Sequence, residues 1–173
     1  MTQTTDKPRT DMDFFISLQR EVGEMLPRLL DNYNWHRLVS VMAFYSSLIE
    51  KNSAIQQGSI KISVRNIRQE LLDISATAFV MVLSLENLRR RREAHAALWQ
   101  ETLNLYKAKN QDYGNSYKRF GSAGVVIRLR DKLLRIRQLV DFNAAVKAES
   151  LRDTLVDTIN YGILAVLCID QGM

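Results

Sequence analysis

The chain has 173 residues, a formal net charge of +5 and a single cysteine, Cys168. Hydrophobic residues make up 46% of it and charged residues 25%, the balance of a globular protein that buries a core without disulfides or metal staples. One thiol excludes an internal disulfide, and its apolar surroundings predict a buried cysteine in a reducing compartment. The polar first ten residues lack the apolar core of a signal peptide, and no apolar run approaches the roughly 20 residues that span a bilayer. We therefore expect a cytoplasmic protein with no membrane partner.

Apolar residues recur at three- and four-residue steps through most of the chain, which predicts helices. Three helices are expected in the first half, at about 11–30, 34–49 and 63–88, with a polar loop at 51–59. Pro27 interrupts the first and marks a place for a kink. No Gly or Pro occurs between Gly58 and Gly114. We favour a break at the run Arg89–Arg92, followed by a further helix at about 94–109, over one very long helix.

Two more helices are expected at about 125–142 and 150–169, with no credible strand. The predicted fold is an all-α bundle of about five to six helices. We divide the chain into a disordered tail (1–10), an N-terminal helical region (11–100) and a C-terminal helical region (101–173), with the two regions packed as one domain.

One segment of the first half can be laid over one of the second. Ile67–Asp73 aligns with Leu151–Asp157, and both continue as apolar helices. Two readings stay open at this point: a degenerate duplication, or two amphipathic helices that merely share a period.

The last predicted helix carries polar residues spaced four, four and three apart, at Glu149, Asp153, Asp157 and Asn160. At about 100° per residue these side chains fall in one narrow stripe. Stacked carboxylates repel one another, and their hard oxygens suit Mg²⁺. The alternative is a capping box at Ser150–Asp153, which would make Asp153 a helix-start residue.

The preceding helix has a second polar stripe, formed by Arg128, Asp131, Arg135 and Gln138. Alone it reads as a surface ladder of ion pairs worth under about 1 kcal/mol. Placed antiparallel to the acidic helix, it would instead supply one more carboxylate and two phosphate-binding cations.

Residues 109–124 are expected to form a basic, aromatic loop punctuated by glycines. Cations at Lys109, Lys118 and Arg119 could bind phosphates, and neighbouring aromatic rings could stack on a base or ribose. The spacing of a Walker-type phosphate loop is absent.

Several of these residues occur in a fixed order, as Lys109-x-x-Asp112-Tyr113-Gly114-x-Ser116, Phe120-Gly121, Ile127-Arg128-x-x-Asp131-Lys132-x-x-Arg135 and Glu149-Ser150-Leu151-x-Asp153-Thr154-x-x-Asp157-x-x-Asn160-Tyr161. This order resembles the nucleotide-modification-associated domain 1 family, a phage and bacterial group. That family in turn resembles the MazG-like all-α nucleoside triphosphate pyrophosphohydrolases. The resemblance covers roughly the C-terminal third of the chain.

The resemblance implies a homodimeric helical bundle that uses Mg²⁺, or Mn²⁺, to cleave a (deoxy)nucleoside triphosphate into monophosphate and pyrophosphate. Metal ligands would be Asp131, Glu149, Asp153 and Asp157, the first three of them catalytic. Substrate-binding residues would be Lys109, Asp112, Tyr113, Arg128, Lys132, Arg135 and Asn160. The chain departs from the MazG-like E-x-x-E pattern, and Glu70-x-x-Asp73 fits the second MazG-like pattern better than any segment downstream.

Two other functions remain as alternatives. The first is a non-catalytic protein that binds and sequesters a nucleotide through the same cations. The second is a helical interaction or nucleic-acid-binding protein that uses Arg89–Arg92. We expect no nucleic-acid partner, because an arginine run embedded in helices is most often a solvated surface.

Overall fold

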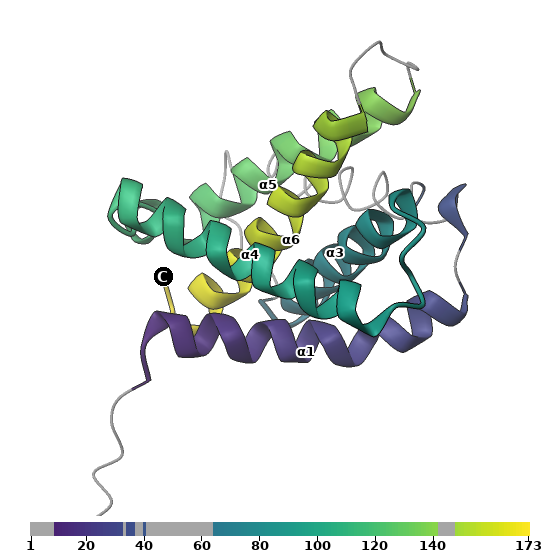
Figure 1. Ribbon diagram of the computed structural model, residues 1–173. Helices are drawn as coiled ribbons and strands as arrows, with labels where there is room; N and C mark the ends of the chain where they lie inside the picture. The colour runs from purple at the N-terminus through teal and green to yellow at the C-terminus, as the bar shows by residue number, and fades with distance from the viewer. Residues whose placement is uncertain (1–8, 33, 37–39, 41–63, 142–147) are drawn as a thin grey trace, which may run out of the picture.

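The computed structural model describes residues 9–32, 34–36, 40, 64–141 and 148–173. These residues form five helices and no strand, which confirms the all-α bundle (Figure 1). The helices are α1 (Asp11–Asp31), α3 (Val64–Leu85), α4 (Arg92–Tyr113), α5 (Tyr117–Asp141) and α6 (Ala148–Asp170). The helix expected at about 34–49 falls mostly outside the described residues, as do the loop at 51–59 and the start expected at Ser63.

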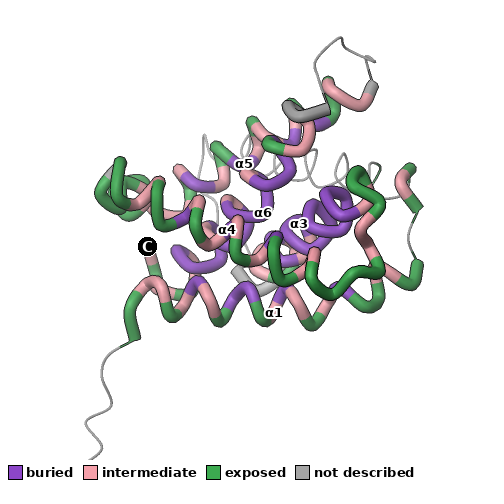
Figure 2. The backbone as a smooth tube through the Cα atoms, viewed as in Figure 1, coloured by how far each residue is buried: buried purple, intermediate pink, exposed green. Residues whose placement is uncertain are grey.

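Helix α6 lies at the centre, packed most extensively against α3 and α5 and also against α1 and α4 (Figure 1). Residues on nearly every side of it are therefore buried (Figure 2). They include Leu155, Ile159, Ile163 and Cys168, which confirms the expected core face and the buried thiol. Among the described helices, none is long and apolar enough to cross a membrane.

Helices α3 and α6 approach closely where small side chains meet. A Cβ added at Gly162 would lie 2.1 Å from Ser75 Oγ and 2.9 Å from the Leu71 carbonyl oxygen. Ser75 Oγ donates to the carbonyl of Leu71 in its own helix and lies 3.1 Å from the Ile159 carbonyl of α6. Glycine is therefore required at this crossing, which holds the central pair of helices together.

The arginine run separates two helices, as expected. Helix α3 ends at Leu85, and α4 begins at Arg92 after a turn in which Asn87 adopts a positive φ of 56°. The amide of Leu88 donates to the Leu83 carbonyl, which closes the end of α3. The turn brings α4 back across the bundle instead of extending α3 into solvent.

The expected loop at 109–124 is wrong for most of its length. Helix α4 continues to Tyr113 and stops at Gly114, which takes the left-handed conformation (φ 56°) typical of a helix end. Helix α5 begins only three residues later, at Tyr117. The glycine at 121 (φ 57°) kinks α5 at a point where an added Cβ would lie 2.8 Å from the Met173 carbonyl carbon, and the next amide, of Ser122, donates to the Met173 carbonyl. Two glycines thus mark a helix end and a kink, so the basic residues project from helices.

The capping-box reading of Ser150–Asp153 is also wrong. Helix α6 begins at Ala148, so Ser150 lies inside the helix and Asp153 in its second turn. Asp153 is exposed. Its carboxylate is therefore available for a role other than helix capping.

Candidate functional site

Three helices bring charged side chains together around Asp157 of α6. Lys109 from α4 reaches one carboxylate oxygen (Nζ–Oδ1 2.6 Å), and Lys132 from α5 reaches the other (Nζ–Oδ2 2.7 Å). The Asp157 side chain is 19% exposed, whereas those of Lys109 and Lys132 are 38% and 25% exposed. The cluster thus lies at the protein surface, in the seam where α4 and α5 flank α6, and we call it the lysine seam.

The protonation of Asp157 follows from these contacts. Burial acts to raise the pKa of its carboxyl, but hydrogen bonds from Lys109 and Lys132, with their positive charges, outweigh burial and lower it. The carboxylate is therefore ionised at neutral pH. With two ammonium groups around one carboxylate, the lysine seam carries a net positive charge and suits an anion that offers more than one oxygen.

Tyr161 belongs to the lysine seam, although we did not predict it as a site residue. It follows Asp157 by one helical turn, and Lys109 Nζ lies 5.5 Å from the centre of its ring, within cation–π range. The i,i+4 spacing from Asp157 was the signal that could have identified it.

Asn160 lies beneath the lysine seam and not on its surface. It is only 4% exposed, and its Nδ2 donates to the Thr102 carbonyl of α4 (3.1 Å). The Thr102 hydroxyl in turn accepts from Gln19 of α1 (2.9 Å). Asn160 Oδ1 is buried with no hydrogen-bond partner among the described residues. The expected stripe therefore divides, with Asp153 exposed, Asp157 half-buried and Asn160 tying α6 to α4.

Helix α5 presents its basic residues on the flank next to the lysine seam. Leu129, Leu133 and Ile136 are buried as expected. Arg128 and Arg135 are exposed one turn before and after Lys132, so all three cations lie along one side of the helix. These residues extend the positive charge from Lys132 along the surface of α5.

The predicted acidic ligands do not gather into one cluster. Asp131 is exposed and, at 100° per residue, points away from the buried side of α5. Asp153 is exposed on α6, one turn before Asp157. The side chain of Glu149 is outside the described residues, which contain no group of three or more His, Cys, Asp or Glu that could hold a metal. Of the predicted ligands with described side chains, Asp153 and Asp157 are therefore the two that share a helix, one turn apart.

Glu70 and Asp73 lie at a different place on the bundle. Arg68 of α3 contacts Asp170 near the end of α6, and Arg152 near the start of α6 contacts Glu86, so α3 and α6 are antiparallel. Glu70 is therefore level with the last turns of α6, more than two helical turns from Asp153. Burial and the nearby charge of Asp73 raise the pKa of Glu70.

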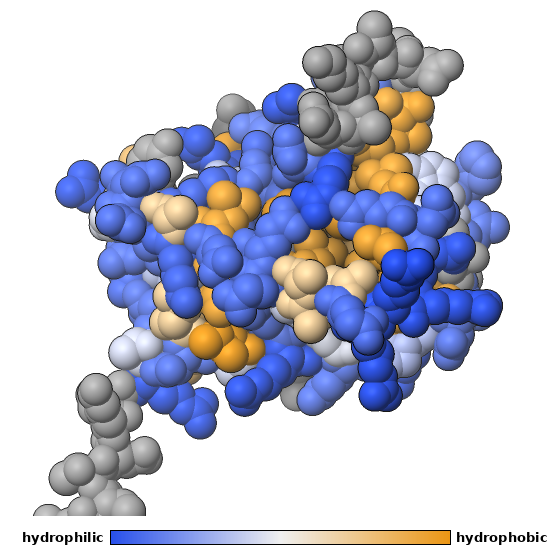
Figure 3. All heavy atoms as spheres, viewed as in Figure 1, coloured by the Kyte–Doolittle hydropathy of each residue, from blue (hydrophilic) through white to orange (hydrophobic). Residues whose placement is uncertain are grey.

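The remaining predicted residues lie in the last turn of α4 and in the connection between α3 and α4. Asp112 is exposed in the last turn of α4, and the side chain of Tyr113 lies outside the described residues. Arg90, Arg91 and Arg92 are exposed where α3 connects to α4. Figure 3 shows the most hydrophilic surface gathered at this corner. The arginine run is therefore separate from the lysine seam.

Comparison with protein families matches residues 109–169 to the family described as Nucleotide modification associated domain 1. The matched region begins at Lys109, the α4 member of the lysine seam, and includes all of α5 and α6 to residue 169. No curated protein and no solved structure matched the chain. The match thus covers every member of the lysine seam and none of α1 or α3.

Proposed function

We propose that the lysine seam binds the phosphate groups of a nucleotide, and that the chain is a Mg²⁺-dependent (deoxy)nucleoside triphosphate pyrophosphohydrolase. The convergence of Lys109, Lys132 and Asp157 from three helices is the observation that carries the proposal. All three residues lie within the region that matches a nucleotide-associated family.

Phosphate is the anion that fits this arrangement best. It offers several oxygens and up to two negative charges, and it is a stronger partner for two ammonium groups than one shared carboxylate is. A phosphate bound by Lys109 and Lys132 would release Asp157 from both ion pairs. Arg128 and Arg135 would lie along the path of the remaining phosphates, and the Tyr161 ring offers a surface for the sugar or base.

The acidic residues fit a magnesium ion that arrives with the nucleotide. Magnesium is commonly held by one or two carboxylates together with substrate phosphates, and Asp153 and Asp157 are one turn apart beside the phosphate-binding lysines. Such an ion would neutralise the developing charge of the phosphoryl group. That Asp131 and Glu149 complete the ligand set stays a prediction.

Hydrolysis also needs a group that orients water. Asp157, once released by the lysines, is the carboxylate closest to the bound phosphates and would accept a hydrogen bond from the attacking water. Lys109 and Lys132 would hold the phosphate chain, which is where phosphoryl-transfer catalysis mostly acts.

The proposal is tested by incubating the protein with a panel of nucleoside and deoxynucleoside triphosphates and Mg²⁺, followed by chromatography for monophosphate and pyrophosphate. We expect release of both products, lost in EDTA and in Asp153→Ala. Monophosphate release that persists in both controls would contradict the assignment of the metal ligands.

One observation favours a sequestering protein as the second candidate. The negative charge of Asp157 is balanced by two lysines, so no metal is needed to offset its repulsion of a phosphate. The lysine seam could therefore bind phosphate without a metal. Nucleotide-dependent stabilisation that persists in EDTA, without any product, would support sequestration over hydrolysis.

A further inference from the structure

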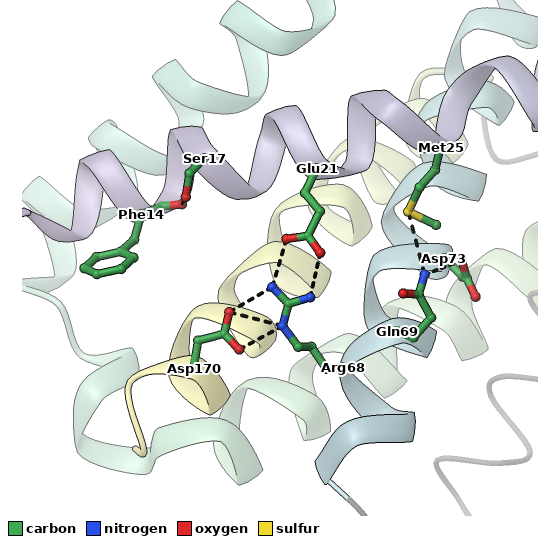
Figure 4. A network of polar contacts seen from close by, with 8 residues as sticks. All are labelled: Phe14, Ser17, Glu21, Met25, Arg68, Gln69, Asp73 and Asp170. Atoms are coloured by element: carbon green, nitrogen blue, oxygen red, sulfur yellow. Dashed lines mark hydrogen bonds and ion pairs between the residues drawn. The ribbon is translucent and has the colours of Figure 1, made fainter.

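Arg68 of α3 joins three helices. Its Nη1 and Nη2 donate to Glu21 Oε1 and Oε2 of α1 (2.6 and 2.8 Å), and its Nε donates to Asp170 Oδ1 of α6 (2.9 Å). Figure 4 shows the guanidinium held between the two carboxylates. These ion pairs raise the pKa of Arg68 further above its usual range.

Arg152 of α6 makes the same contacts with the corresponding atoms. Its Nη1 and Nη2 donate to Glu101 Oε1 and Oε2 of α4 (2.7 and 2.8 Å), and its Nε donates to Glu86 at the end of α3. Each arginine therefore binds a glutamate of the first described helix in its own half, α1 for Arg68 and α4 for Arg152. Each arginine also binds an acidic residue at the C-terminal end of the opposite central helix, Asp170 of α6 for Arg68 and Glu86 after α3 for Arg152.

The interval in sequence is fixed for each pair of equivalent helices and differs by four residues between the central pair and the outer pair. Arg152 follows Arg68 by 84 residues, and Asp170 follows Glu86 by the same 84 residues. Glu101 follows Glu21 by 80 residues. Two helices that merely share a hydrophobic period would not also exchange partners at such fixed intervals.

Burial follows the same intervals. Positions 17–32 of α1 and its C-cap match positions 97–112 of α4 in burial class, with the exception of Gln19 and Trp99. On α3 and α6, the half-buried residues Asp73 and Asp157 occupy equivalent positions, each between buried neighbours. The correspondence thus extends along both pairs of helices.

The two halves face each other about a common axis. Ser75 contacts the carbonyl of Ile159, its own equivalent 84 residues later, so the axis passes through the crossing of α3 and α6. Helices α1 and α4 are antiparallel as well, because Phe15 stacks on Tyr106 and Gln19 bonds to Thr102. A two-fold axis perpendicular to the helices produces antiparallel pairs of this kind.

We infer that the chain contains two copies of one helical unit, related by a pseudo-two-fold axis, and that only the second copy has the lysine seam. The first copy, with α1 and α3, fills the place that a second subunit would occupy beside α4 and α6. In the first copy, residues 32–63 connect α1 to α3, and most of this segment lies outside the described residues. In the second copy, residues 114–147 connect α4 to α6.

In the described part of the first copy, the position equivalent to Lys109 holds an apolar residue. Asp73 stands where the second copy has Asp157, but Leu29 stands where it has Lys109. Toward the core, Ala76 and Thr77 stand in the places of Asn160 and Tyr161. Leu29 is partly buried and packs against the core. The first copy therefore keeps the carboxylate, but its helix α1 has no lysine at the position equivalent to Lys109 of α4.

This asymmetry gives one phosphate site per chain. That the ligand is a phosphate rests on the proposed function, whereas the number of sites rests on the repeat. Helices α3 and α6 cover each other's apolar faces within one chain. A single copy would have to bury that face against another molecule. The homodimer expected from sequence remains a prediction and would have to use a different surface.

The repeat is tested by restoring the missing cation with Leu29→Lys in the full chain, with Leu29→Gln as the uncharged control. A lysine stem can lie along the apolar surface that Leu29 covers while its ammonium group reaches the carboxylate. Carboxyl carbon resonances followed by NMR should show the titration midpoint of Asp73 moving to lower pH in Leu29→Lys alone. Equal Asp73 midpoints in two folded variants would overturn the inferred correspondence.

A second measurement uses the unsubstituted protein and does not depend on whether Leu29→Lys folds. Calorimetric titration with inorganic pyrophosphate should give one equivalent bound per chain. Two equivalent sites per chain would overturn the single-site inference. An Asp73 shift without any pyrophosphate binding would uphold the repeat and remove the proposed function.

Discussion

Replacing Asp157 by asparagine tests the lysine seam most sharply. The substitution keeps the size of the side chain and removes the charge that holds Lys109 and Lys132. We expect opposite effects on stability and on ligand response. The free protein becomes less stable, whereas its stabilisation by pyrophosphate becomes larger, because the two ammonium groups no longer share an internal anion.

The magnitude follows from the geometry. Each lysine nitrogen lies within 2.7 Å of one oxygen of the same carboxylate. The nitrogens are therefore at most about 7 Å apart and, at an effective dielectric constant of about 20, repel by at least about 2 kcal/mol once the carboxylate is neutral. The partial exposure of the two lysines reduces this repulsion. The loss of two half-buried ion pairs adds a further contribution to the destabilisation. A total of about 2 kcal/mol corresponds to a fall in Tm of about 4–8 °C.

The assay is thermal unfolding of Asp157→Asn with and without pyrophosphate, beside Asp153→Asn as the matched control. Asp153 is an exposed aspartate one turn away, so its substitution should change stability by less than about 0.5 kcal/mol. Equal stability of the two variants, or a smaller pyrophosphate response in Asp157→Asn than in the unsubstituted chain, would refute the reasoning.

Three further predictions concern the fold. Gly162→Ala should destabilise the protein by about 1–3 kcal/mol in urea unfolding, because its Cβ would overlap atoms of α3, whereas Gly23→Ala has open space and should be neutral or slightly stabilising. The thiol of Cys168, whose pKa burial raises to about 11, should react with a thiol reagent at neutral pH only as fast as the protein opens; prompt labelling would contradict its burial. The pKa values of Glu21 and Glu101 are lowered chiefly by hydrogen bonds from their arginine partners, against the effect of burial. Their stabilisation should therefore be present above their unfolded pKa of about 4.3 and be lost as pH falls through the lower folded values; urea midpoints that stay constant from pH 5 to 2 would contradict this.

Much of the fold could be predicted because helical periodicity is a strong local signal. The spacing of apolar residues located α1, α3 and α6, and the arginine run located the break before α4. Local composition failed at residues 109–124, where glycines and aromatic residues suggested a loop. Gly114 ends one helix and Gly121 only kinks the next, and that distinction depends on the contact of Gly121 with Met173, far along the chain.

Sequence spacing singled out the charged residues of the candidate site but not their contacts or Tyr161. Spacing placed Asp153 and Asp157 on one side of a helix, but it could not show that Lys109 and Lys132 would meet Asp157. That meeting depends on how α4 and α5 pack beside α6. Asn160 shows the same limit: spacing aligned it with Asp157 as a surface residue, whereas the approach of α4 buries it against Thr102. The repeat was visible in sequence as an alignment of two short segments, and only the exchanged ion pairs distinguish duplication from a shared period.

The central claim is that the lysine seam binds nucleotide phosphates. Its most direct test is calorimetric titration of a deoxynucleoside triphosphate into the unsubstituted chain and into the double variant Lys109→Met, Lys132→Met, with Arg90→Met, Arg91→Met as a control of equal charge change at the arginine run. Loss of at least tenfold in affinity with the lysine variant, and little change with the arginine variant, is the predicted result. Equal affinity in the unsubstituted chain and the lysine variant would contradict the account.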